Sequence, residues 1–209
     1  MIAMILAAGR GERMRPLTDT TPKPLLLVKE KTLIVWHIEK LVSTGFTTII
    51  INIAHLGECI IDSLGDGKKW GIKIIYSDER ESGALETAGA IIKSLPNLSE
   101  TFLVVNGDIW CDYDFKIDFD LKDSLAHLIL VQNPEHNLKG DFLYQDSYYT
   151  FSGIGYYSKE IFKDMPLEKR ALAPILKELI SKDKISFELH TRVWSDIGTP
   201  ERLALVNTL

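Results

Sequence analysis

Short apolar segments and amphipathic segments alternate along most of the chain. The apolar segments are rich in β-branched residues and predict strands at Ile2–Leu6, Thr48–Ile53, Ile72–Tyr76, Thr101–Asn106 and His127–Val131. Each is apolar almost throughout, which is the pattern of strands covered on both faces of a sheet. The amphipathic segments repeat their apolar residues at helical spacing and predict helices at Thr32–Val42, Glu58–Leu64, Glu86–Leu95, Pro174–Lys182 and Pro200–Leu205.

Strands that alternate with helices predict an α/β fold of the doubly wound, Rossmann-like type, with a mostly parallel sheet flanked by helices. Residues 141–157 break the alternation with shorter β patterns, and we expect a small insertion of antiparallel strands there. No internal repeat or low-complexity linker divides the chain. Sheets of this type bind ligands at the carboxyl ends of their strands, so the residues that follow each strand are candidates for a site.

The composition is that of an ordinary globular domain. The chain has 209 residues, of which 45% are hydrophobic and 25% charged, and one core can bury about 70% of the surface of a chain of this size. We therefore expect one domain over residues 1–209. The formal net charge of −5 provides no basic block for nucleic acid or an anionic membrane, and the apolar start is too short for a membrane span or a leader. Cys59 and Cys111 lie far apart, which favours a cytoplasmic protein with reduced thiols.

A glycine-rich loop follows the first predicted strand. Gly9 and Gly11 would let the backbone approach a phosphate closely, and the exposed amides of such a turn form a cradle for anions. A dinucleotide-binding loop needs a third glycine where this chain has Met14, and the Gly-Lys-Ser/Thr of a P-loop is absent. Farther on, Lys23 stands between two prolines, so a stiff segment would aim its ammonium group at a fixed point.

Two aspartates are candidates for a metal site. Asp108 follows the strand predicted at Thr101–Asn106, and Asp196 follows a short strand later in the chain. Two carboxylates and the phosphates of a substrate form a sufficient set of oxygen ligands for Mg²⁺, which keeps several waters. Either aspartate alone would be interpreted as a turn residue. Neither the other aspartates nor the histidines have the spacing of a metal site, and we expect a solvated acidic face at Asp112, Asp114, Asp118, Asp120 and Asp123.

The glycine loop and the segments around Asp108 together resemble a known family. The string Ala-Ala-Gly-Arg-Gly-Glu-Arg-Met-Arg-Pro-Leu-Thr at 7–18, followed by Pro-Lys-Pro-Leu at 22–25, is similar to the signature of the sugar-1-phosphate nucleotidylyltransferases. The resemblance extends over nearly the whole chain and implies that family's type of doubly wound fold, the nucleotide-diphospho-sugar transferase fold, in one catalytic domain over residues 1–209. Its further stretches are Leu85–Gly89, Val105–Phe115, Gly140–Phe142 and Phe151–Ile154.

The resemblance also implies roles for individual residues. Arg15 and the loop amides would hold the β- and γ-phosphates of a nucleoside triphosphate, and Lys23 would bridge its α-phosphate to the sugar phosphate. Mg²⁺ would be the cofactor, bound by Asp108 and Asp196, of which Asp108 counts with Arg15 and Lys23 as catalytic. The nucleotide would lie against Leu6, Ala7, Ala8, Gly9, Gly11, Ala88 and Gly89. The sugar would lie near Asn106, Gly140, Asp141 and Gly153.

Within the family, the motifs favour transfer of a uridylyl group from UTP to N-acetylmuramic acid 1-phosphate with release of pyrophosphate, a reaction of peptidoglycan recycling. Guanylyl transfer to mannose or heptose 1-phosphate and thymidylyl transfer to glucose 1-phosphate are alternatives. A non-catalytic nucleotide-sugar sensor and a nicotinamide oxidoreductase are further ones, the second disfavoured by Met14. The expected partners are a nucleoside triphosphate, with UTP favoured, and a sugar 1-phosphate. No nucleic acid and no membrane is expected as a partner. A monomer or a weak homo-oligomer is expected.

Two segments depart from the family pattern. The loop Asp78–Gly83 is longer than usual, within residues 77–84 that are expected to close around the base. The segment Gln145–Thr150 lacks the lysine with which many relatives hold the sugar phosphate. The resemblance therefore leaves this phosphate to Lys23 and the metal, or to a residue that the sequence does not identify.

Overall fold

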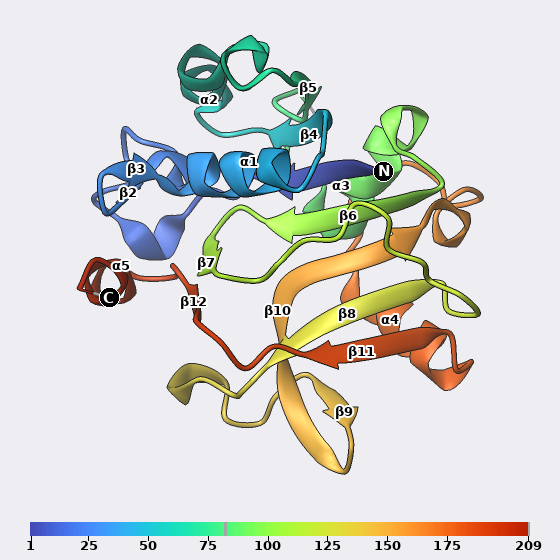
Figure 1. Cartoon of the computed structure of the whole chain (residues 1–209). Helices are drawn as coiled ribbons and strands as arrows, with labels where there is room; N and C mark the ends of the chain where they lie inside the picture. Colours follow the sequence, from blue (N-terminus) through green and yellow to red (C-terminus); the bar gives the residue numbers. More distant parts are fainter. Residues whose placement is uncertain (82, 209) are drawn as a thin grey trace.

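The computed structural model describes residues 1–81 and 83–208, and it shows a central sheet with helices on both faces (Figure 1). In these residues the strands lie in the order β11-β8-β10-β6-β1-β4-β5, and β9 pairs with β10 beyond this row. Two small sheets pair β2 with β3 and β7 with β12. The strands are β1 Ile2–Leu6, β2 Leu27–Val28, β3 Lys31–Thr32, β4 Thr48–Ile53, β5 Lys73–Asp78, β6 Thr101–Asn106, β7 Ile109–Cys111, β8 Ala126–Val131, β9 Phe142–Tyr144, β10 Ser147–Ser158, β11 Ile185–Leu189 and β12 Trp194–Asp196.

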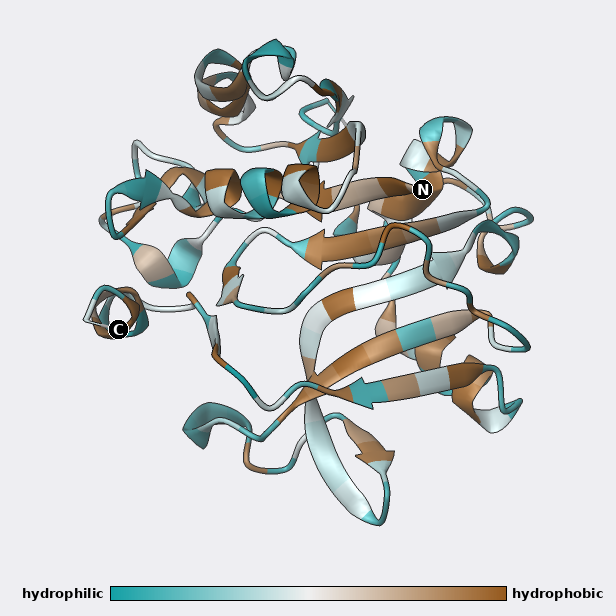
Figure 2. Ribbon diagram, viewed as in Figure 1, coloured by the Kyte–Doolittle hydropathy of each residue, from teal (hydrophilic) through white to brown (hydrophobic). Residues whose placement is uncertain are grey.

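The helices cover the two faces of this sheet. Helices α1 and α2 pack on one face together with alternate residues of the strands, among them Ala3 and Ile5. Helices α3 and α4 pack on the other face against residues such as Met4 and Ile50. Strands β1, β4 and β6 are accordingly apolar over most of their length, as the brown colour in Figure 2 shows. The helices are α1 Leu33–Ser43, α2 Gly57–Leu64, α3 Glu86–Ser94, α4 Ala173–Ser181 and α5 Pro200–Val206.

Helix α1 illustrates how local sequence places an element. Its residues Ile34, Ile38 and Leu41 recur at helical spacing and are fully buried, which contributes about 1.5–3 kcal/mol for each side chain. The helix ends before Gly45, whose φ of 97° most other residues adopt only at a cost, and the amide of Phe46 donates to the carbonyl of Leu41. The chain then enters β4 directly.

Strand direction places the ends of most strands at one edge. Strands β5, β4, β1 and β6 are parallel to one another, and β8 is parallel to β11. Strand β10 is antiparallel to both β6 and β8. The carboxyl ends of β1, β4 and β6 therefore meet at the same edge of the sheet. The order of the strands reverses at β1, because β4 and β5 follow on one side of it and β6 is added on the other.

The predicted doubly wound, mostly parallel fold is confirmed, with one difference in the region 141–157. Its strands are antiparallel as expected, but β10 has 12 residues and lies inside the main sheet between β6 and β8. A register shift between Phe151 and Ile154, with Gly153 at a φ of 85°, divides this long strand into parts that look short in the sequence. Only the hairpin of β9 and the start of β10 extends beyond the main row of strands.

Most predicted elements lie within two residues of their observed bounds, and β1, β4 and β6 match at both ends. Strands β7 and β11 had no prediction of their own. In the described part of the chain, no helix has the length and apolar character needed to cross a membrane.

Candidate active site

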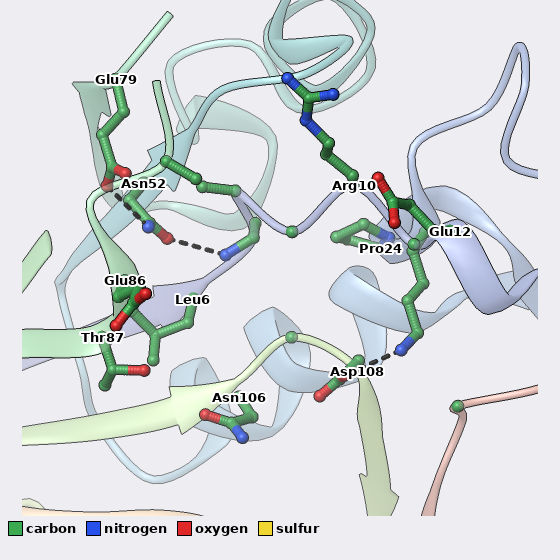
Figure 3. Close-up of a pocket in the computed structure, with 18 of the residues that line it drawn as sticks. Leu6, Arg10, Glu12, Pro24, Asn52, Glu79, Glu86, Thr87, Asn106 and Asp108 are labelled. Atoms are coloured by element: carbon green, nitrogen blue, oxygen red, sulfur yellow. Dashed lines mark hydrogen bonds and ion pairs between the residues drawn. The ribbon is translucent and has the colours of Figure 1, made fainter. Parts of the chain in front are cut away.

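A cavity of about 560 Å³ opens at the carboxyl ends of β1, β4 and β6 (Figure 3). The glycine loop after β1 forms one wall, and the start of α3 and the end of β6 form the others. Of the residues predicted to form the site, Leu6, Ala7, Ala8, Gly9, Gly11, Lys23, Asn106 and Asp108 line this cavity. Its other lining residues are Arg10, Glu12, Arg13, Pro24, Asn52, Glu79, Ala84, Glu86, Thr87, Gly107 and Gly198.

The glycine loop is shaped by a tight turn at Gly11. Gly11 has a φ of 65°, and a Cβ atom there would lie 3.0 Å from the side chain of Thr18. The hydroxyl of Thr18 donates to the carbonyl of Gly11 at 2.8 Å, which closes the loop on itself. Gly9, by contrast, has open space around it, as an approach of a phosphate to the backbone requires.

Lys23 reaches across the cavity to Asp108. Its ammonium Nζ lies 2.7 Å from Oδ2 of Asp108, and its side chain is only 9% exposed. The buried Pro22 and Pro24 hold the backbone on either side. This contact joins the segment after the glycine loop to the end of β6, as the sequence led us to expect of a stiff segment that aims one charge.

A buried polar link supports the glycine loop from behind. The amide of Ala7 donates to Oδ1 of Asn52, and Nδ2 of Asn52 donates to Oε1 of Glu79, each at 2.8 Å (Figure 3). The other carboxylate oxygen of Glu79 accepts from the amide of Leu85, also at 2.8 Å. This link was not predicted from the sequence. The position of Asn52 could have indicated it, because Asn52 is the one amide side chain within the isoleucine run of β4.

The pairing of β7 with β12 brings the two candidate metal ligands together. Asp196 lies opposite Ile109 in this pair, and the amide of Ile197 donates to the carbonyl of Asp108 at 2.7 Å. His37 of α1 contacts β7, with its Nε2 atom 2.8 Å from the carbonyl oxygen of Ile109. Burial of this imidazole lowers the pKa of His37 to about 4, so the ring is neutral at pH 7 and donates from Nε2.

The chemistry of this pair fits Mg²⁺. In the described residues, no cluster of three or more His, Cys, Asp or Glu side chains forms a closed cage. Mg²⁺ does not need one, since it is commonly bound by one or two carboxylates together with substrate phosphates and water. Asp108 lines the cavity and its side chain is 42% exposed, whereas Asp196 lies behind the lining residue Gly198 and its side chain is 23% exposed. The pair thus provides a partial ligand set that a phosphate substrate would complete.

Arg15 lies outside the cavity, contrary to prediction. Its Nε is 3.4 Å from Asp19, and its side chain is 63% exposed. Met14, which lies between Arg13 and Arg15, is fully buried in a small core with Leu33. The short 3₁₀ turn η1, Glu12–Met14, therefore directs the side chains of the two arginines to different sides. Arg10 and Arg13 are the arginines of this loop that line the cavity.

Ala88 and Gly89 lie behind the cavity, in the first turn of α3 directly after the lining residues Glu86 and Thr87. The amides of both donate to the carbonyl of Arg170. A Cβ atom on Gly89 would lie 2.5 Å from the carbonyl oxygen of Glu168. The structure thus gives Gly89 a packing function against the segment before α4, rather than a place in the cavity wall. Of the loop 77–84 expected near the base, Glu79 and Ala84 line the cavity and Ser82 lies outside the described residues.

The predicted sugar-binding residues fall into two groups. Asn106 lines the cavity. Gly153 packs against the side chain of Asn106, since a Cβ atom on Gly153 would lie 2.7 Å from Nδ2 of Asn106. Gly140 and Asp141 lie in the connection between β8 and β9 and do not line the cavity. Both carboxylate oxygens of Asp141 fix this connection, accepting from Phe151 N at 2.8 Å and from Asn137 Nδ2 at 3.2 Å.

Known proteins are similar to this chain over nearly its whole length. A family model described as nucleotidyl transferase matches residues 2–142. An N-acetylmuramate α-1-phosphate uridylyltransferase of Neisseria meningitidis is 51% identical, over 97% of this chain and 95% of its own. The catalytic subunit beta of a mannose-1-phosphate guanylyltransferase of Drosophila melanogaster is 32% identical, over 95% of this chain and 60% of its own.

Solved structures show the same fold. A protein from Bacillus anthracis described as a glucose-1-phosphate thymidylyltransferase, in complex with sucrose, superposes with a TM-score of 0.87 at 20% identity, over 100% of this chain and 94% of its own. HddC from Yersinia pseudotuberculosis, complexed with GMP-PN, superposes with a TM-score of 0.75 at 24% identity, over 99% and 98%.

Proposed function

Because the chain belongs to the nucleotidyl transferase family, we propose that it transfers a uridylyl group from UTP to N-acetylmuramic acid 1-phosphate. The class of reaction is sugar-1-phosphate nucleotidyl transfer. The choice of UTP and of this sugar is carried by one observation, the 51% identity to the uridylyltransferase over nearly the full length of both chains. The reaction belongs to the reuse of cell-wall sugars, and we place it in the cytoplasm, in one catalytic domain over residues 1–209, as a monomer or a weak homo-oligomer.

The reaction joins two anions. An oxygen of the sugar phosphate attacks the α-phosphorus of UTP, the bond to the bridging oxygen of the β-phosphate breaks, and pyrophosphate leaves with the electron pair. The protein contributes mainly by holding the two phosphates in line and by offsetting their mutual repulsion. A cavity with fixed cations on its wall suits this task.

Each cationic residue has a distinct part in this proposal. Arg10 and Arg13 hold the β- and γ-phosphates together with the amides of the glycine loop, in the place that the sequence assigned to Arg15. Lys23 exchanges its contact with Asp108 for the α-phosphate and the sugar phosphate. Asp108 and Asp196 would hold Mg²⁺, which supplies neutralisation of the charge that develops on the phosphates.

The two organic parts of the substrates lie at opposite sides of these charges. The base packs near Leu6–Ala8, where backbone groups can hydrogen-bond its edge, and the link from Asn52 to Glu79 keeps that wall fixed. The sugar lies near Asn106, whose amide can both donate and accept. Gly153 leaves room for the side chain of Asn106.

A panel of substrates tests this function. Each of the four nucleoside triphosphates is combined with N-acetylmuramic acid 1-phosphate, mannose 1-phosphate or glucose 1-phosphate, and release of pyrophosphate is measured with and without Mg²⁺. We expect the highest kcat/KM for UTP with N-acetylmuramic acid 1-phosphate. Preference for GTP with mannose 1-phosphate would replace this proposal by guanylyl transfer, which the 32% identity to the Drosophila protein supports less strongly. Absence of pyrophosphate release with every pair would refute transfer altogether.

A further inference from the structure

The two expected metal ligands are each matched by one cation in a similar way. Lys23 lies 2.7 Å from Asp108, and Arg202 lies 2.7 Å from Asp196. Lys23 has its place in the proposed reaction, whereas Arg202 has none so far. Arg202 extends from the first turn of α5, and its side chain is only 18% exposed although it carries a full charge. A charge held this far from solvent needs an anionic partner, which Asp196 supplies in the absence of substrate.

Arg202 connects the metal side of the site to the sugar side. Its Nη1 donates to Oδ1 of Asp196 and lies 2.8 Å from Nε2 of His136. His136 belongs to the short turn η5, Glu135–Asn137, in the connection that continues to Gly140 and Asp141. In the proposed reaction the phosphate of the sugar lies between the metal aspartates and the sugar. Arg202 joins one of these aspartates to the connection that leads to Gly140 and Asp141.

Arg202 does not itself line the cavity, but its guanidinium group lies directly behind one residue of the cavity wall. Gly198 lines the cavity, and a Cβ atom on Gly198 would lie 2.1 Å from Nη2 of Arg202 and 2.8 Å from Oδ2 of Asp196. A side chain at position 198 would therefore displace Arg202. Only glycine leaves the room in which the guanidinium group sits against this wall.

Two of the donor nitrogens of Arg202 make no hydrogen bond to Asp196 or His136, and one of them, Nη2, packs against Gly198 of the cavity wall. Within the described residues, its side-chain hydrogen bonds to Asp196 and His136 are all made by Nη1. The nitrogens Nη2 and Nε remain, and together they form the planar fork that matches two oxygens of a phosphate. The contact with Asp196 and His136 holds this fork in a fixed orientation, which lowers the entropy lost on binding.

From this geometry we infer that Arg202 binds the 1-phosphate of the sugar substrate, with His136 as the residue that positions it. The inference rests on the proposed function, since it names the residue that recognises the acceptor phosphate of that same reaction. The alternative is that Arg202 serves only to fix Asp196, in which case the phosphate of the sugar would not sense its removal.

The experiment compares Arg202→Gln and Arg202→Lys with Lys177→Gln, a loss of an exposed charge on α4. We expect Arg202→Gln to raise the KM for the sugar 1-phosphate by about 10- to 100-fold and to leave the KM for UTP within about twofold, as loss of one charge-assisted contact to a single substrate predicts. Arg202→Lys should recover only part of this loss, because an ammonium group cannot form the fork. Lys177→Gln should match the wild type.

A binding measurement removes the dependence on turnover. Calorimetry in EDTA compares N-acetylmuramic acid 1-phosphate with unphosphorylated N-acetylmuramic acid, on the wild type, Arg202→Gln and His136→Ala. We expect the wild type to prefer the phosphorylated sugar, Arg202→Gln to lose this preference, and His136→Ala to retain a reduced one. Circular dichroism establishes that each variant is folded, and if Arg202→Gln fails to fold, Arg202→Lys and His136→Ala carry the same comparison.

The outcomes separate the two proposals. If the wild type turns over no substrate pair, the proposed function fails, while the calorimetry still reports on Arg202. If the wild type is active and Arg202→Gln changes only the Mg²⁺ concentration for half-maximal activity, with the KM for the sugar 1-phosphate unaltered, Arg202 merely fixes Asp196 and the inference is overturned. An unchanged preference for the phosphorylated sugar in both Arg202 variants would overturn it as well.

Discussion

The ammonium group of Lys23 lies 2.7 Å from the carboxylate of Asp108, although 85 residues separate the two along the chain. This ion pair crosses the cavity between the segment that follows the glycine loop and the end of β6. In the proposed function, this ion pair joins the wall that would hold the phosphates to the wall that would hold the metal.

Replacing Lys23 by alanine should lower kcat about 100- to 1000-fold, since it removes the cation that faces both phosphates. The melting temperature should change little, because Asp108 is 42% exposed and can be solvated once its partner is gone. Steady-state rates and a thermal melt check both parts. A rate close to that of the wild type would remove Lys23 from the site.

Asp108→Asn and Asp196→Asn should each abolish Mg²⁺-dependent turnover while the protein stays folded. An amide lacks the charge that a hard divalent cation requires. Calorimetric titration with Mg²⁺ in the presence of a non-hydrolysable UTP analogue should show loss of metal binding in both variants. Asp118→Asn, on the exposed segment before β8, is the matched control. Metal binding retained in either site variant would contradict the assignment.

Arg13 and Arg15 form a matched pair that tests the correction to the glycine loop. Arg13→Gln should raise the KM for the nucleoside triphosphate by about tenfold or more, since it removes a charge-assisted contact to phosphate. Arg15→Gln should leave this KM within about twofold, because Arg15 pairs with Asp19 outside the cavity. The reverse order of effects would restore the prediction made from the sequence.

Asn52 should matter for both stability and nucleotide binding. Asn52→Leu removes the acceptor of the buried amide of Ala7 and one hydrogen bond to Glu79, which costs about 2–3 kcal/mol in the free energy of unfolding. Because Ala7 begins the glycine loop, the KM for the nucleoside triphosphate should rise together with this loss. Urea unfolding and steady-state kinetics test the two effects. Loss of stability with an unchanged KM would limit Asn52 to a structural role.

His37 should make the stability of the protein depend on pH. Burial lowers the pKa of His37 to about 4, whereas the unfolded chain binds a proton near its ordinary value of 6.5. Stability from this residue is therefore complete above pH 6.5 and falls by up to about 3 kcal/mol as the pH drops towards 4. His37→Gln can still donate to the carbonyl of Ile109 and does not titrate. Urea unfolding between pH 7 and 4 should give a flatter dependence for this variant, and equal slopes would contradict the assignment.

The sequence predicts those parts of the fold that depend on local pattern. The isoleucine run of β4 and the apolar run of β6 identify buried strands without reference to anything else in the chain. Asp108 follows from the same reasoning, because a residue just beyond a buried parallel strand lies at the ligand-binding edge. The glycine loop is recognised by its composition and by its place after β1.

The remaining features depend on contacts between distant segments. The place of β10 between β6 and β8 is set by pairing across the sheet, which leaves no mark in the sequence of β10 itself. The choice of Arg13 over Arg15 depends on which way a single 3₁₀ turn faces, and that is decided when Met14 is buried against other elements. Arg202 lies 66 residues from His136 in the chain, so only the folded molecule shows that the two meet.

The reversed direction of β10 also divides the molecule into two parts that can vary separately. Because β10 enters the sheet from the edge at which β6 ends, the hairpin that it forms with β9 lies apart from the glycine loop (Figure 1). If the sugar binds near Asn106 as we propose, an exchange of this hairpin and of the connection that carries His136 should change the acceptor specificity and leave the binding of the nucleotide unaltered.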